Sequence, residues 1–126
     1  MKISTLLHAT ILVENLDEAR KFYEQILGFT ASASRPEMSF AGVWYELGCQ
    51  QLHLMQLPNP EIGLVRPLNG GRDRHIAFAV DELPGLMCRL EGAGIKYNLS
   101  QTGRRALFCR DFDDNALEFI ALAVSE

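Results

Sequence analysis

The chain has few cysteines and no long apolar run, and each absence excludes a class of protein. Its three cysteines, Cys49, Cys88 and Cys109, are far apart and form no CxxC pair, so no disulfide framework is expected. We expect three buried, reduced thiols in a cytoplasmic protein. No stretch approaches the roughly 18 apolar residues of a transmembrane helix. Residues 1–13 lack the charged, apolar and small-residue regions of a signal peptide.

Positive charge is also scarce. The 12 Lys and Arg residues are outnumbered by 16 Asp and Glu residues, giving a formal net charge of −4. The chain therefore has no basic footprint for nucleic acid or for an anionic membrane surface. Its 126 residues, 48% of them hydrophobic, suit one compact soluble domain over residues 1–126.

An internal repeat covers most of the chain. HATILVENLDEA, which begins at His8, matches HIAFAVDELPGL, which begins at His75. Residues 27–29 match 93–95, and residues 52–54 match 117–119, so the three offsets are 67, 66 and 65 residues. Order and spacing are both kept, which indicates two similar structural modules.

The hydrophobic pattern gives each module the order β-α-β-β-β, which is an α+β fold class. The first module covers residues 1–57, a turn-rich linker covers 58–72, and the second module covers 73–126. Expected strands are 6–13, 29–34, 40–47 and 50–57, then 74–80, 95–98, 105–110 and 116–122. One helix runs from an Asp17 cap to about Leu27, before Gly28. The other covers Leu83 to about Gly92, with Pro84 in its first turn.

Strand alternation brings four metal-competent side chains to one face of the predicted sheets. The bulkier face of the first strand in each module should pack on the helix, so His8 and His75 point away from it. His53 and Glu118 lie between core-type neighbours in the last strands and also face away. The repeat superposes His8 on His75 and His53 on Glu118, and these are all the histidines of the chain.

Three imidazoles and one carboxylate form a plausible ligand set for one divalent ion: zinc, nickel, cobalt, manganese or ferrous iron. The alternative interpretation is that the histidines are hydrogen-bonded structural or surface residues. Glu118 would then be the solvent side of an amphipathic strand.

These residues lead to a family resemblance that runs from about Leu6 to Leu122. The chain resembles the vicinal oxygen chelate superfamily, which contains glyoxalases, bleomycin-resistance proteins and ring-cleaving dioxygenases. The resemblance rests on the segments HATILVENLDEARKFYEQILGF, YELGCQQLHLMQ, RHIAFAV and ALFCRDFDDNALEFIAL. It implies two tandem βαβββ modules forming an open, cup-like sheet around a metal ion, with the helices outside. It also implies a homodimer, in which some members share the metal between chains.

Residue by residue, His8, His75 and Glu118 match the metal ligands common to metal-dependent members of the family. His53 stands where glyoxalase I has a second glutamate, so the chain departs here from a family mechanism that transfers a proton between two carboxylates. The family's usual D-P-D-G turn is replaced by the sequence DFDDN at residues 111–115. Its Asp114-Asn115 pair can still form a tight turn.

The resemblance implies a small-molecule substrate that offers two neighbouring oxygens to the metal, which acts as a Lewis acid. Glu118 would be both ligand and general base. Thr10 could donate a hydrogen bond to the substrate, and Arg104 and Arg105 could hold an anionic group. Substrate identity would depend on the loops 32–40 and 58–72.

Four functions fit this set of residues. The first is a metal-dependent lyase or isomerase of the glyoxalase type. The second is a thiol transferase like those of fosfomycin resistance, and the third is a ferrous ring-cleaving dioxygenase. The fourth is a metal-free module that binds a drug, as bleomycin-resistance proteins do. Retention of all four metal-competent positions favours the enzymes over the binding module.

Overall fold

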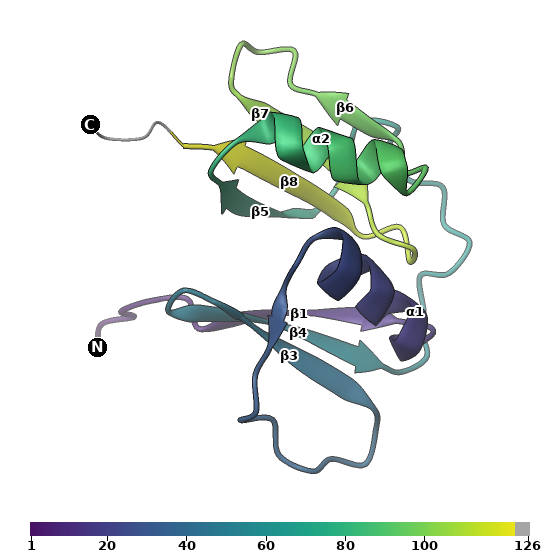
Figure 1. The fold of residues 1–126 in the computed structure, drawn as a ribbon. Helices are drawn as coiled ribbons and strands as arrows, with labels where there is room; N and C mark the ends of the chain where they lie inside the picture. Colours follow the sequence, from purple (N-terminus) through teal and green to yellow (C-terminus); the bar gives the residue numbers. More distant parts are fainter. Residues whose placement is uncertain (123–126) are drawn as a thin grey trace. The chain divides into compact units, whose positions relative to one another are not determined.

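The computed structural model describes residues 1–122 (Figure 1). The chain divides into two compact units, Met1–Ile62 (unit 1) and Gly63–Glu126 (unit 2), and the boundary lies inside the predicted linker. Each unit contains one four-stranded mixed sheet and one main helix. The predicted α+β fold with two βαβββ modules is therefore confirmed. Within residues 1–122, no helix is long and apolar enough to cross a membrane.

In the sheet of unit 1, the first and last strands of the unit pair in parallel, and the other neighbouring strands pair antiparallel. The strand order is β1-β4-β3-β2. Its elements are β1 (His8–Val13), α1 (Leu16–Arg20) continued by η1 (Lys21–Ile26), β2 (Thr30–Ala31), β3 (Gly42–Leu47) and β4 (Gln50–Gln56).

Unit 2 repeats this topology with the strand order β5-β8-β7-β6, which confirms the internal repeat. Here β5 pairs in parallel with β8, and the remaining pairs are antiparallel. Its elements are η2 (Gly70–Arg72), β5 (His75–Val80), α2 (Leu83–Gly92), β6 (Tyr97–Leu99), β7 (Ala106–Arg110) and β8 (Ala116–Ala121). The short helix η2 was not predicted, and its Asn69 cap accepts a hydrogen bond from the Gly71 amide.

The strand register places the repeat-equivalent residues at equivalent points of the two sheets. His53 lies opposite Thr10 of β1, and Glu118 lies opposite Ala77 of β5. Because side chains directly opposite one another share a face, His53 lies on the face of Thr10, and Glu118 on that of Ala77. The sequence repeat is therefore also a repeat of sheet geometry.

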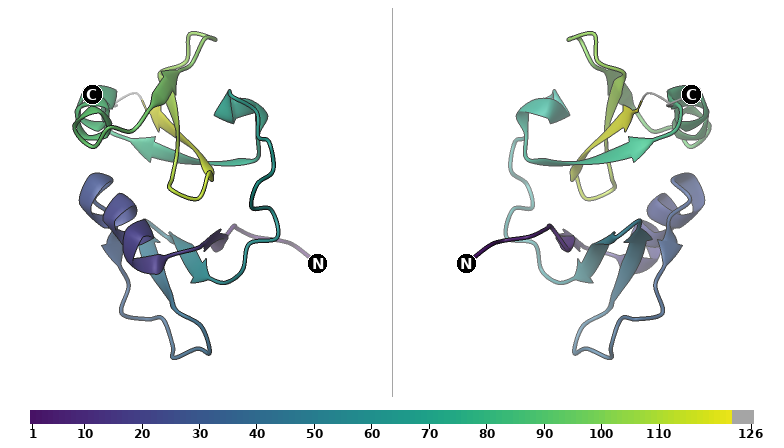
Figure 2. Two further views of the ribbon diagram at one scale, coloured as in Figure 1. Left: turned by 90° about the vertical axis from the view of Figure 1, so that its right-hand side faces the viewer. Right: turned by 90° about the vertical axis from the view of Figure 1, so that its left-hand side faces the viewer.

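Burial confirms which face of each sheet packs on a helix. Along β5, exposed His75, Ala77 and Ala79 alternate with less exposed Ile76, Phe78 and Val80. Figure 1 shows α2 against one face of its sheet, and the side views of Figure 2 show the sheet and helix as separate layers. The larger side chains thus face the helix, and the face that carries histidine is left open for a site.

The first helix begins earlier than the sequence predicts. The N-cap is Asn15, whose Oδ1 accepts a hydrogen bond from the Glu18 amide at 3.0 Å, and Asp17 lies inside the first turn. Asn and Asp are both good caps, so residue type alone could not separate the two positions. The helix ends as predicted at Gly28, whose φ of 79° is readily adopted by glycine.

Replacing the observed cap should destabilise the protein more than replacing the predicted one. We expect Asn15→Ala to lower the free energy of unfolding by about 1 kcal/mol, because an amide of the first turn loses its partner. Asp17→Ala removes only a charge near the helix start and should cost about 0.3 kcal/mol. Urea unfolding followed by circular dichroism measures both, and the reverse order would contradict this cap.

The prediction of three buried thiols is wrong for two of them. Cys49 and Cys88 are exposed, and only Cys109 is buried. Cys49 follows Gly48 in the tight turn between β3 and β4, where apolar neighbours in the sequence do not enclose it. Burial raises the pKa of Cys109 to about 12, so its reactive thiolate form is scarce at neutral pH.

Thiol accessibility is therefore expected to separate the cysteines. Iodoacetamide at about pH 8 should alkylate Cys49 and Cys88 in the folded protein, because the thiolate is the nucleophile and both thiols reach solvent. Cys109 should react only after denaturation. Intact-mass and peptide mass spectrometry count and locate the adducts, and rapid native labelling of Cys109 would contradict its burial.

Candidate functional site

The two predicted metal ligands of unit 2, its donor pair, are His75 on β5 and Glu118 on β8, the first and last strands of the sheet. The Nε2 atom of His75 lies 3.1 Å from Oε1 of Glu118, and Glu118 is only 3% exposed. The Nδ1 atom of His75 lies 2.9 Å from the carbonyl oxygen of Asp73. The Asp73 carbonyl can only accept, so its hydrogen bond needs the hydrogen on Nδ1, and the Glu118 carboxylate competes for that hydrogen at Nε2.

Two arginines bind the side chain of Asp73, the residue whose carbonyl oxygen contacts His75. The Asp73 side chain is 10% exposed and receives hydrogen bonds from Arg110 at 2.8 Å and Arg66 at 3.3 Å. Arg110 also donates to the carbonyl of Pro67 at 2.6 Å. The hydrogen bond from the Arg110 guanidinium lowers the pKa of Asp73. This ion pair connects the segment before β5 to strand β7.

The two arginines predicted to bind substrate differ in their surroundings. Arg104 donates from Nη2 to Oε2 of Glu118 at 2.9 Å, although its own side chain is 56% exposed. Both carboxylate oxygens of Glu118 thus have partners, one imidazole and one guanidinium. Arg105 is exposed, and its main-chain oxygen accepts from the Ala121 amide. Their substrate-binding role stays a prediction.

The donor pair of unit 1 is built from stacked rings on three neighbouring strands. The His8 and His53 rings lie 4.0 Å apart between centroids at an interplanar angle of 12°. Trp44 of β3, directly opposite His53, stacks on its other side at 4.1 Å and 3°. His53 is 7% exposed, and burial lowers its pKa, as do the nearby charges of His8 and Arg35. The neutral imidazole is the form with a lone pair for a metal.

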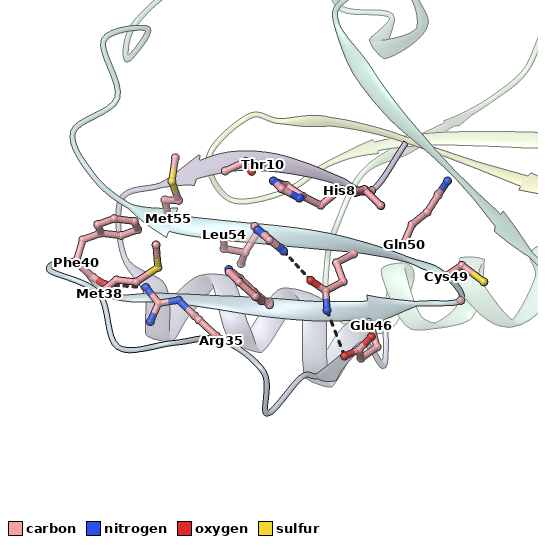
Figure 3. A pocket seen from close by; sticks show the side chains of 15 residues that line it. His8, Thr10, Arg35, Met38, Phe40, Glu46, Cys49, Gln50, Leu54 and Met55 are labelled. Atoms are coloured by element: carbon pink, nitrogen blue, oxygen red, sulfur yellow. Dashed lines mark hydrogen bonds between the residues drawn. The ribbon is translucent and has the colours of Figure 1, made fainter. Parts of the chain in front are cut away.

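A side-chain relay determines which nitrogen of His53 carries the hydrogen. Oε1 of Gln51 lies 2.8 Å from His53 Nε2, and Nε2 of Gln51 donates to Glu46 Oε1 at 3.3 Å (Figure 3). Because the carboxylate of Glu46 accepts, the Gln51 amide nitrogen faces it and the oxygen faces His53. The neutral His53 ring therefore carries its hydrogen on Nε2 and its lone pair on Nδ1.

A cavity of about 590 Å³ opens beside this ring stack in unit 1 (Figure 3). His8, His53 and Thr10 line it, which places Thr10 beside both predicted ligands of this unit. Apolar side chains and one arginine, Arg35, complete much of the wall. This volume is within the range of small-molecule sites, about 300–1,000 Å³.

Of the four predicted metal ligands, each unit brings two together, His8 with His53 and His75 with Glu118. Over residues 1–122, no group of three or more His, Cys, Asp or Glu side chains is close enough to hold a metal ion. The ligand set therefore stays a prediction. The set fits a metal by its chemistry, because imidazole nitrogen and carboxylate oxygen are both metal ligands, and His53 and Glu118 offer them at buried positions.

Sequence reasoning missed several residues of these sites. Trp44 and Gln51 flank His53, Asp73 orients His75, and Arg35 lines the cavity. Trp44 could have been found by pairing β3 with β4, because the register of the predicted hairpin places it opposite His53. The contact between His75 and the Asp73 carbonyl could not be found from the sequence, because every residue type has a main-chain carbonyl.

Comparison with solved structures shows which fold this is. A FosX variant from Listeria monocytogenes, complexed with Mn(II) and 1S,2S-dihydroxypropylphosphonic acid, matches with a TM-score of 0.75 at 20% identity. The match covers 98% of this chain and 95% of that chain. Lactoylglutathione lyase from Agrobacterium tumefaciens matches with a TM-score of 0.65 at 20% identity, over 95% of both chains.

The sequence comparison identifies the family. Residues 5–119 match the model of the Glyoxalase/Bleomycin resistance protein/Dioxygenase superfamily, and the chain belongs to this superfamily. "Glyoxylase I 4" of Arabidopsis thaliana is 28% identical over 97 residues, which is 77% of this chain. The matched region covers 56% of the Arabidopsis protein, so the chain spans little more than half of that relative. The predicted resemblance is thereby confirmed.

The hydrogen bonds predict opposite tautomers for two histidines. In the metal-free protein at alkaline pH, we expect the hydrogen on Nε2 of His53, because Gln51 accepts it. In His75 we expect the hydrogen on Nδ1, where Asp73 accepts it, once Glu118→Ala has removed the competing carboxylate. Long-range ¹H–¹⁵N correlation spectra distinguish the two forms, with His75→Gln and His53→Gln variants for assignment. The same tautomer in both rings would contradict this description.

Proposed function

We propose that this protein is a metal-dependent enzyme, a lyase or isomerase acting on a small substrate with two neighbouring oxygens. Superfamily membership supports an enzyme, and the relatives named glyoxylase I and lactoylglutathione lyase support this reaction class. In this proposal His8, His53, His75 and Glu118 bind one divalent ion, which is zinc, nickel, cobalt, manganese or iron(II).

The observation that carries the proposal is the contact between His75 and Glu118. With a hydrogen on Nδ1 of His75, a lone pair on Nε2 faces a carboxylate oxygen at 3.1 Å, and a metal ion between the two atoms would accept both lone pairs. Two ligand atoms, each about 2.1 Å from one metal, are on the order of 3 Å apart. The carbonyl behind His75 fixes the ring as outer-sphere partners of metal-bound histidines do.

The chain's own residues divide the chemistry between the two units. A bound divalent ion would polarise the substrate oxygens and stabilise negative charge that develops on them. Glu118 is the proposed general base, with Arg104 holding Oε2 in place. Thr10 donates a hydrogen bond to the substrate. Because His53 replaces a carboxylate and is neutral, Glu118 both takes the proton and returns it.

Metal content tests the ligand set directly. We expect about one ion per chain by elemental mass spectrometry after reconstitution, and its loss in His75→Ala and Glu118→Ala, because each removes a ligand atom. Loss of a ligand should weaken metal affinity at least tenfold. Glu37→Gln, at an exposed position, is the matched control and should keep the ion. A protein that takes up none of the five metals would contradict the proposal.

Mixing two variants determines whether the proposed homodimer shares its sites. If unit 1 of one chain serves unit 2 of the other, mixed His8→Ala and Glu118→Ala chains form one intact site per heterodimer. If each chain holds its own metal, the mixture stays empty. Formation of a new carbon–sulfur bond from a substrate and a free thiol indicates a thiol transferase, whereas conversion of a preformed thiol adduct or of a substrate alone indicates a lyase or isomerase.

A further inference from the structure

The cavity of unit 1 combines an apolar wall with a single cationic side chain. The apolar part is supplied mainly by Met38, Phe40, Trp44, Leu54 and Met55. Aromatic rings and thioethers pack well on flat, unsaturated ligands. Arg35 is the only lysine or arginine among the residues that line this cavity (Figure 3).

Arg35 keeps most of its hydrogen-bonding capacity. Its Nη2 donates to the carbonyl of Phe40 at 2.8 Å, and its guanidinium carbon lies 5.6 Å from the centre of the Phe40 ring. A guanidinium has five N–H donors. Within residues 1–122, Arg35 forms no ion pair with a carboxylate, and Glu46, the one acidic residue of the cavity, accepts a hydrogen bond from Gln51. Arg35 therefore brings an uncompensated positive charge to the wall.

The backbone holds this arginine in place. A Cβ atom at Gly42 would lie 3.0 Å from Nη2 and 3.1 Å from Nε of Arg35, and 2.5 Å from the Leu54 carbonyl oxygen. Only glycine leaves room for the guanidinium to lie against β3 while β3 stays paired with β4. Arg35 is also half-buried. Its guanidinium is thus preorganised by the strand, by the Phe40 carbonyl and by the Phe40 ring.

We propose that the unit 1 cavity binds an aromatic carboxylate, with the carboxylate on Arg35 and the ring among Phe40, Trp44 and Met38. The guanidinium matches a planar carboxylate, and the pairing is strengthened because the surrounding wall is apolar. This inference rests on the proposed function for its reaction and names the substrate class. Binding itself needs only residues of unit 1, so it can be measured without a metal.

Trp44 is the only tryptophan of the chain and lies in the cavity, so its fluorescence reports binding. Benzoate is expected to change the fluorescence of chelator-treated protein saturably, and uncharged benzamide should bind at least tenfold more weakly. Arg35→Met should weaken benzoate at least tenfold, with little effect on benzamide. Arg35→Lys keeps the positive charge but loses the planar guanidinium with its paired N–H donors, so it should give an intermediate affinity for benzoate.

Arg72→Met, at an exposed position of unit 2, is the matched control and should bind benzoate like the wild type. Equal affinity of wild type for benzoate and benzamide, which requires no variant to fold, would overturn the proposal. Equal benzoate affinity in Arg35→Met would also overturn it. Metal content of Arg35→Met should stay normal, whereas benzoate binding should survive Glu118→Ala. A failure of the carboxylate site is thereby distinguishable from a failure of the metal site.

Discussion

The parallel pairing of the first and last strands in each unit is the constraint on which both donor pairs depend. Parallel strands need a crossover connection, and the helix between the two strands provides it. The helix covers one face of the sheet and leaves the other face open. Side chains alternate along both strands, so the register alone decides which residues meet on the open face. A slip by one residue would turn His53 or Glu118 into the helix layer and separate it from its partner.

The repeat made the architecture predictable, because two matching patterns constrain strand order and face more than one does. The bounds of α2 and the turn at Asp114, whose φ is 62°, follow from local residue types. The cap of α1 and the exposure of Cys49 and Cys88 did not follow, since they depend on backbone geometry or on which neighbours enclose a side chain.

The four metal-competent residues and the sheet face that they share were predictable, but their pairing within each unit and their hydrogen-bond partners were not. The sequence predicted that Arg104 could bind an anionic group, and in the structure it binds the carboxylate of Glu118. Asp73 acts through its carbonyl, which every residue type has, so no sequence pattern reveals it. Arg35 reaches the cavity from the loop between β2 and β3, and its position depends on the missing side chain of Gly42.

The unlike pair of His53 and Glu118 also has a consequence for symmetry. Two identical modules that assemble as separate chains carry the same side chain at both equivalent positions, so a change at one is a change at both. Joining the modules in one chain removes that restriction. One position can then become an imidazole stacked between Trp44 and His8 while the other keeps a carboxylate. The covalent linkage of the repeats is what allows the two halves to differ at equivalent positions, as His53 and Glu118 do.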